Sequence, residues 1–180
     1  MNITAAIAGF TRALLTIGLL LSLAACGFHL RGAVDLPQAA RNVYFDGFSR
    51  DSTLGIALER QVLRNGGQVL ESPLSPSLGV AVVRDETLRN VLSVDASGKA
   101  NEYELSYIVQ FHIVSAQGEP LTDTQRILQV RDLFFDATNV LAKSDEENQL
   151  KAEMVEAAAA QILRQLVTVA QRMSTVDAAQ

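Results

Sequence analysis

Residues 103–114 read YELSYIVQFHIV, and the alternation of apolar and polar side chains in this stretch decides the fold. A period of two is typical of a β-strand, because successive side chains point to opposite faces of the sheet. One face is apolar throughout and is expected in the core, whereas the other face is mixed. The core face consists of Tyr103, Leu105, Tyr107, Val109, Phe111 and Ile113, and the mixed face of Glu104, Ser106, Ile108, Gln110, His112 and Val114.

The segments on either side predict further strands. Residues 78–88 are rich in valine, and residues 93–100 form a turn region before the central strand. The sequence QGEP at 117–120 predicts a hairpin turn that leads into a strand over 122–134. Together with short strands at 43–45 and 68–70, we expect a mostly antiparallel sheet of about four strands.

Two helices are predicted. Leu54, Leu58 and Val62 recur every four residues, with Ser49, Asp51 or Ser52 available as N-cap and glycines at 66–67 to end the helix. The second helix spans about 144–173, where neither Gly nor Pro occurs, with Ser144 as N-cap and acidic residues 145–147 in its first turn. Its apolar stripe consists of Leu150, Met154, Ala158, Ile162, Leu166 and Val169.

These elements predict an α+β two-layer sandwich, with two helices on one face of the sheet. The segment 41–173 is expected to form a single domain, preceded by a tether over 26–40 and followed by a flexible tail over 174–180. The 25 residues before the tether have the features of a cleaved signal.

The signal is a lipoprotein signal peptide. Arg12 is the only charge in residues 1–25, an apolar run follows it, and the run ends at Leu23-Ala24-Ala25-Cys26, which matches the bacterial lipobox. Cys26 is the only cysteine, so it cannot form a disulfide within the chain. Acylation of its thiol explains why an unpaired cysteine is present. An ordinary secretory signal with a chance cysteine is the alternative. Gly27 after the cysteine favours sorting to the outer membrane, because an Asp there tends to mean retention at the inner membrane.

Length and net charge limit the number of domains and the class of partner that the chain can bind. Removing 25 of the 180 residues leaves 155, enough for one domain with a core. The net charge is −5 for the whole chain and about −6 once Arg12 is removed, which argues against nucleic acid as a partner.

The sequence offers little catalytic chemistry. His29 lies in the tether and His112 lies in the middle of a strand, and no Gly-x-Ser-x-Gly motif accompanies them. Asp132 and Asp136 are interpreted as ordinary polar positions rather than a carboxylate pair. No metal-ligand spacing occurs. We therefore expect no catalytic residue, no metal and no cofactor other than covalent acyl chains on Cys26.

The residues after Cys26 resemble the start of the mature lipopolysaccharide-assembly lipoproteins of the LptE family, in which Gly, an aromatic residue, His, Leu and Arg follow the cysteine. Further likeness covers essentially the whole mature chain. The matching segments are 26–31 (CGFHLR), 63–67 (LRNGG), 101–105 (NEYEL), 130–136 (VRDLFFD) and 141–143 (LAK).

The resemblance implies a fold of two helices on a four-stranded sheet and a non-enzymatic role. LptE-like proteins act as a plug inside the outer-membrane β-barrel LptD, and the pair delivers lipopolysaccharide to the outer leaflet of Gram-negative bacteria. The expected location is the cell outer membrane, lipid-anchored on the periplasmic side and within the barrel lumen. Enclosure in a polar lumen accounts for the mixed strand face. The alternative is a monomer whose sheet face is partly exposed to water.

The resemblance also implies lipopolysaccharide binding through basic side chains. Lys143 matches a lysine of the family, and Arg131 lies in a matching motif. The other basic position of the family reads Ala96 here, so Lys99 or Arg89 is expected to replace it. For each of the four, a solvated surface charge is the alternative.

Two other functions are open at this stage. A lipid-shuttle or adaptor lipoprotein of another envelope transport system predicts a transporter or a periplasmic partner in place of a barrel. A periplasmic hydrolase requires His112 in a cleft beside a serine and a carboxylate.

Overall fold

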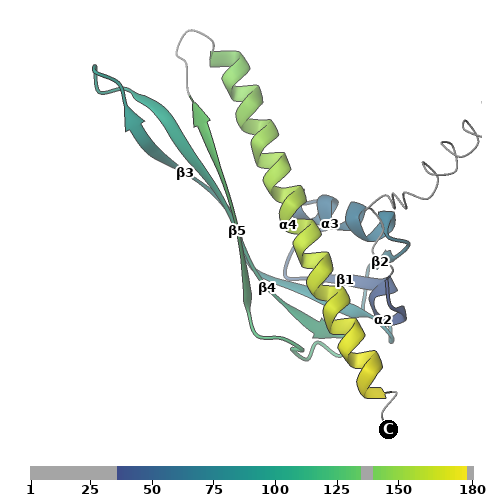
Figure 1. Cartoon of the computed structure of the whole chain (residues 1–180). Coiled ribbons are helices and arrows are strands. Elements are labelled where there is room, and N and C mark those ends of the chain that lie inside the picture. Colours follow the sequence, from purple (N-terminus) through teal and green to yellow (C-terminus); the bar gives the residue numbers. More distant parts are fainter. Residues whose placement is uncertain (1–35, 135–139, 178–180) are drawn as a thin grey trace, which may run out of the picture. The chain divides into compact units, whose positions relative to one another are not determined.

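The computed structural model describes residues 36–134 and 140–177, and side chains within 36–134 and 142–175. Cys26, the motif at 26–31 and Asp136 lie outside these residues. The described residues contain three helices and the five strands of one sheet (Figure 1). In chain order they are α2 (Gln38–Arg41), β1 (Asn42–Asp46), α3 (Thr53–Arg64), β2 (Gln68–Leu70), β3 (Leu78–Val94), β4 (Ala100–Ser115), β5 (Gln125–Phe134) and α4 (Val140–Asp177).

The sheet has five strands in the order β2-β1-β3-β4-β5, and all five segments expected to be strands take part in it, where a sheet of about four was expected. β1 pairs in parallel with both β2 and β3, whereas β3, β4 and β5 are antiparallel. A parallel pair requires a crossover connection, and α3 provides it between β1 and β2. The predicted α+β class with helices on one side of the sheet is confirmed, and the sheet is mixed.

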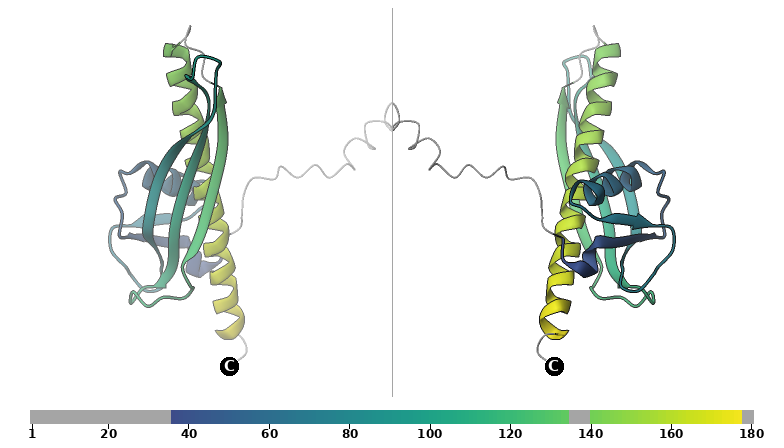
Figure 2. Two further views of the ribbon diagram at one scale, coloured as in Figure 1. Left: turned by 90° about the vertical axis from the view of Figure 1, so that its left-hand side faces the viewer. Right: turned by 90° about the vertical axis from the view of Figure 1, so that its right-hand side faces the viewer.

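The β3–β4 hairpin is longer than the valine-rich segment predicted. β3 continues past residue 88 to Val94, because its second half pairs with β4 up to Ala100. β5 begins at Gln125 rather than at 122, and the Thr122 hydroxyl instead accepts the Ile113 N–H (3.0 Å). Figure 2 shows the hairpin running beside the first half of α4, so both end at the same end of the domain.

The start of α3 follows from its cap. The Ser52 hydroxyl accepts the N–H of Gly55 (3.0 Å) and satisfies one of the free donors at the helix start. Gly66 then takes φ +77°, which glycine adopts readily, and its N–H bonds the Leu63 carbonyl (3.1 Å). Of the three candidate caps, Ser52 is therefore the one used.

The start of α4 was predicted wrongly. The helix begins at Val140, so Ser144 is not its N-cap, and residues 145–147 lie in its second turn. Residues 140–143 (VLAK) contain neither Gly nor Pro, so nothing in them stops the helix from extending toward the N-terminus. At the other end the helix runs past Met173 to Asp177, into the segment expected to be a tail.

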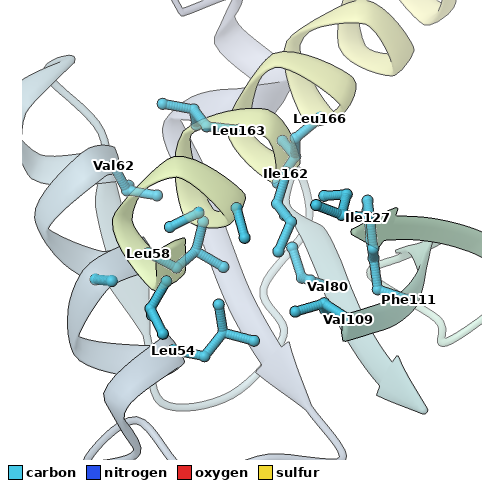
Figure 3. Close-up of a cluster of buried hydrophobic side chains, with 14 of the residues drawn as sticks. Leu54, Leu58, Val62, Val80, Val109, Phe111, Ile127, Ile162, Leu163 and Leu166 are labelled. Atoms are coloured by element: carbon cyan, nitrogen blue, oxygen red, sulfur yellow. The ribbon is translucent and has the colours of Figure 1, made fainter. Parts of the chain in front are cut away.

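The core lies between the sheet and the helices α3 and α4 (Figure 3). The apolar stripes predicted for both helices are confirmed except at Leu150, which is partly buried. The apolar face of β4 is buried except at Tyr103, which is half-buried. Leu36 and Ala40, in the segment interpreted as a tether, are also buried there. Fully buried side chains in this core include Leu54, Leu58, Val62, Val80, Val109, Phe111, Met154, Ile162 and Leu166.

None of the helices in the described ranges combines the length and the apolar character that crossing a membrane requires.

Candidate functional site

The sheet face that turns away from α3 and α4 is mixed. We call it the open face. Residues paired in register share a face, so the even-numbered residues of β4 define it. On the half of this face nearer the β3–β4 turn, which we call its outer half, three apolar side chains are exposed: Leu88 (40%), Leu128 (45%) and Val130 (38%). The open face comprises Arg84, Glu86 and Leu88 of β3, Glu104 to Val114 of β4 in steps of two, and Arg126 to Phe134 of β5 in steps of two.

The apolar side chains of the open face are contiguous. Ser106 pairs with Leu88 on one side and with Val130 on the other, and the next level down pairs Ile108 with Leu128. Phe134, at the end of β5, is 65% exposed. Clustered exposed apolar side chains of this kind mark interaction surfaces on proteins.

Polar side chains on the same face are arranged in pairs. Arg84 forms an ion pair with Glu86. Glu104 stands directly opposite Asp132, and the Ser106 hydroxyl donates to Glu104 (3.1 Å). Two like charges directly across a strand pair weaken a sheet, which indicates that stability alone did not select this surface.

His112 lies on the inner half of the open face. It pairs in register with Ala81, beside a small cluster formed by Tyr44, Ala81 and Val114. Its Nδ1 is buried and has no hydrogen-bond partner in the described part of the chain. A general-base histidine needs a group that fixes its tautomer, so nothing within the described residues prepares His112 for a hydrolase triad.

A second site lies on the helix side of the sheet, where two of the four predicted basic residues, Arg89 and Arg131, lie at the same level. A third, Lys143, lies on α4 one turn before Glu147, the ion-pair partner of Arg89. Leu105 pairs with Arg89 on β3 and with Arg131 on β5, so both arginines share its level and its face. Arg131 Nη1 donates to the Val130 carbonyl (2.7 Å). Because neighbouring strands lie about 4.8 Å apart, the two backbones are separated by roughly 10 Å.

Arg89 is held by two contacts. Its Cζ lies 3.7 Å from the centroid of the Tyr103 ring, and its Nη1 lies 3.2 Å from Glu147 Oε2. The ring face attracts the cation, and the carboxylate completes an ion pair with α4. Arg89 therefore connects the hairpin to the long helix.

Two lysines of α4 complete the cluster. Lys143 Nζ lies 2.7 Å from Glu146 Oε2, and Lys151 Nζ lies 2.7 Å from Glu147 Oε1. Residues four apart share a helix face, so Lys143, Glu147 and Lys151 form one line at a rise of about 6 Å per step. We call Arg89, Arg131, Lys143 and Lys151 the basic cluster. Lys151 was missed, although its four-residue spacing from Lys143 was the available signal.

Lys99 lies apart from the basic cluster, exposed in the β3–β4 turn. Asp95 organises this turn, because its Oδ1 accepts from the Ser97 hydroxyl (2.7 Å) and from the N–H of Lys99 (3.0 Å). These hydrogen bonds hold the pKa of Asp95 below its ordinary value, the one from the Ser97 side chain most of all. Six residues of strand separate Lys99 from Leu105, about 20 Å in extended chain.

Beside Lys151 the helices leave a cleft against β3 and β4, lined in part by Asp51, Asp85, Tyr107 and Lys151. The Tyr107 hydroxyl is buried there, close to Asp85 but not in hydrogen-bonding geometry with it. Burial is the largest cause that raises the pKa of Tyr107, and the neighbouring Asp85 raises it further. The hydroxyl therefore stays neutral at physiological pH.

Solved structures of small bacterial lipoproteins share this two-layer fold. An uncharacterized lipoprotein B from Nitrosomonas europaea, solved by NMR, is 32% identical, with a TM-score of 0.65 over 78% of this chain and 90% of that one. The rare lipoprotein B of Shewanella oneidensis shares the fold, with a TM-score of 0.62 over 74% of this chain and 98% of that one, at 23% identity.

The sequence identifies the family within this class. The model of the family described as "LptE: Lipopolysaccharide-assembly" matches residues 40–166, so the chain belongs to the LptE family. The LPS-assembly lipoprotein LptE of Photorhabdus laumondii is 28% identical over 81% of this chain and 79% of its own length. That of Pectobacterium atrosepticum is 27% identical over 86% and 84%. These matches confirm the resemblance first seen after Cys26.

Proposed function

We propose that this chain is an outer-membrane lipoprotein that plugs an LptD-type β-barrel and takes part in the delivery of lipopolysaccharide to the outer leaflet. Its role is non-enzymatic, as a structural partner of the barrel. Membership of the LptE family supports the link to lipopolysaccharide assembly. The partner and the plug arrangement rest on the surfaces described above.

The observation that carries the plug proposal is the open face. It presents contiguous exposed apolar side chains, Leu88, Leu128 and Val130, among ion-paired and opposed charged residues. The lumen of an outer-membrane barrel is polar, and interfaces of this kind join an apolar centre to a polar rim. Such a face fits the inner wall of a barrel better than it fits bulk water.

Anchoring follows from Cys26. Acyl chains on this cysteine hold the mature chain on the membrane, and two or more chains anchor stably where one does not. Gly27 favours the outer membrane as the destination. The anchor thus places the domain on the periplasmic side, beside the barrel that it enters.

The basic cluster supports lipid binding. Arginine offers a two-pronged donor to phosphate and lysine a compact charge, so the phosphates of lipid A suit Arg89, Arg131 and Lys143. Lys99 is a peripheral contact at the hairpin tip. The lipid then lies along the helix side of the hairpin, away from Glu104 and Asp132.

Co-purification tests the plug proposal. The tagged full-length chain is recovered from solubilised outer membranes, and an LptD-type barrel is expected in stoichiometric amount. Recovery of no barrel would overturn the proposal. Recovery of an inner-membrane transporter or another periplasmic protein instead would favour the lipid-shuttle or adaptor function.

Charge reversal tests the lipid role. Lys143→Glu places a second acid beside Glu146 and is expected to weaken binding of purified lipopolysaccharide at least about fivefold, because it replaces a phosphate partner with a repelling charge. Arg164→Glu is the matched control, an exposed cation further along the same helix. Equal binding by Lys143→Glu and the wild type would remove Lys143 from the site.

A further inference from the structure

We propose that Glu147 is an internal competitor for lipid phosphate, which occupies the basic cluster in the free protein and sets its affinity for phosphorylated lipid. This inference rests on the proposed lipid role of the cluster. The inference assigns Glu147 a role that opposes lipid binding. It also means that the ion pairs of Glu147 must break before a lipid phosphate can bind the basic cluster.

The first argument is that one carboxylate serves two cations. Glu147 Oε2 faces Arg89 Nη1 at 3.2 Å, and Oε1 faces Lys151 Nζ at 2.7 Å. Its side chain is 16% exposed, less than any other carboxylate in the described ion pairs. Glu147 thus holds the position relative to both cations that a phosphate would require.

The second argument concerns what happens when the carboxylate leaves. The Arg89 guanidinium also lies 3.7 Å from the centroid of the Tyr103 ring, a contact that does not depend on Glu147. The cation therefore keeps its position after the ion pair breaks, with its N–H donors available. A phosphate then meets an arginine already in place and a lysine one helical turn away from Glu147.

The third argument is the repulsion between the charged Glu147 carboxylate and a bound phosphate. A phosphate bound to Arg89 comes within a few ångströms of the displaced carboxylate, and two anions that share one cation repel each other. The two cations are each 38% exposed, which weakens their ion pairs with Glu147, so a phosphate with several charges can displace the carboxylate, but the carboxylate reduces the affinity. A neutral side chain of the same shape at 147 should remove this opposition.

The test compares the binding of purified lipopolysaccharide and of its enzymatically dephosphorylated form to the full lipidated chain. Glu147→Gln is expected to bind the phosphorylated form about two- to fivefold more tightly than the wild type, with no gain for the dephosphorylated form. Adding Arg89→Gln should cancel the gain, because the freed cation is what the phosphate uses.

Glu156→Gln is the matched control. Glu156 also lies on α4 and also bridges two cations, Arg60 (3.1 Å) and Arg64 (3.4 Å), but these belong to α3 and lie outside the basic cluster. The change in net charge is the same, so affinity should stay at the wild-type value.

The outcomes separate the two proposals. If the wild type and Glu147→Gln bind equally, or if Glu156→Gln gains as much, Glu147 is not a competitor although the lipid role stands. If neither the wild type nor Glu147→Gln binds phosphorylated lipopolysaccharide, the proposed lipid role fails and the competitor role fails with it.

Discussion

At the scale of single residues, Gly55 shows how closely α3 meets the loop before it. A Cβ on Gly55 would lie 2.4 Å from the Ser49 carbonyl oxygen and 2.5 Å from that of Arg50. Both atoms belong to the backbone, so neither can turn aside as a side chain can. The absence of a side chain at 55 is thus what allows Ser52 to cap the helix in this geometry.

Gly55→Ala is accordingly expected to lower the free energy of unfolding by about 2 kcal/mol, because the loop must shift to admit the methyl group. The sign is informative, since Gly→Ala inside a helix otherwise stabilises by about 0.5–1 kcal/mol. Urea unfolding measures the effect. Leu63→Ala, at a 54% exposed position of the same helix, should stay within about 0.5 kcal/mol of the wild type. A stabilised Gly55→Ala would contradict the close approach.

At the scale of elements, α4 joins the domain together. Its buried stripe packs in the same core as α3 and the central strands, and Ile162 lies there fully buried with Leu58, Val80 and Phe111 (Figure 3). Its first half carries the lysines and Glu147 along the hairpin. One helix therefore provides both core packing and one side of the basic cluster.

Truncation of Ile162 tests the packing of this helix. Ile162→Val should cost about 1 kcal/mol and Ile162→Ala about 3 kcal/mol of unfolding free energy, because a larger cavity is left in a core that relaxes only partly. Urea unfolding again provides the measurement, with Arg164→Ala at an exposed position of α4 as the control. Equal losses for the two Ile162 variants would mean that the site collapses around the cavity.

At the scale of the whole molecule, the two sheet faces have different tasks. The helix side holds the core and the basic cluster, whereas the open face presents Leu88, Leu128 and Val130. A single domain can thus contact a protein wall on one side and a charged lipid on the other. Both surfaces share the strands of one sheet, and α4 adds the two lysines of the basic cluster.

Leu128→Asp tests the division between the faces. It places a charge in the centre of the open apolar cluster and should reduce barrel capture in the co-purification roughly tenfold, since central apolar contacts dominate interface energies. Leu128 is already 45% exposed, so the fold should persist, as circular dichroism would verify. Ile56→Asp, at a 48% exposed apolar position on α3, should leave capture unchanged. If both variants lose the barrel equally, the open face is not the specific contact.

The sequence by itself determined the elements and their buried sides. The alternation in β4 and the four-residue stripes of α3 and α4 are local periods, and a local period depends only on which side chains must leave water. The apolar face of β4, the two-layer arrangement and the family resemblance after Cys26 therefore followed from sequence. Lys143 and Arg131 were likewise named from motifs of the family, and Lys99 and Arg89 as replacements for a basic position that reads Ala96 here.

Only the tertiary structure decided how these elements meet. The parallel β1–β2 pair, the start of α4 at Val140 and the shared level of Arg89 and Arg131 depend on strand register and on long-range packing. The same holds for Glu147, which sequence placed in a first turn and structure placed between Arg89 and Lys151. Ion pairs between distant segments form only after the core fixes those segments, so no local pattern specifies them.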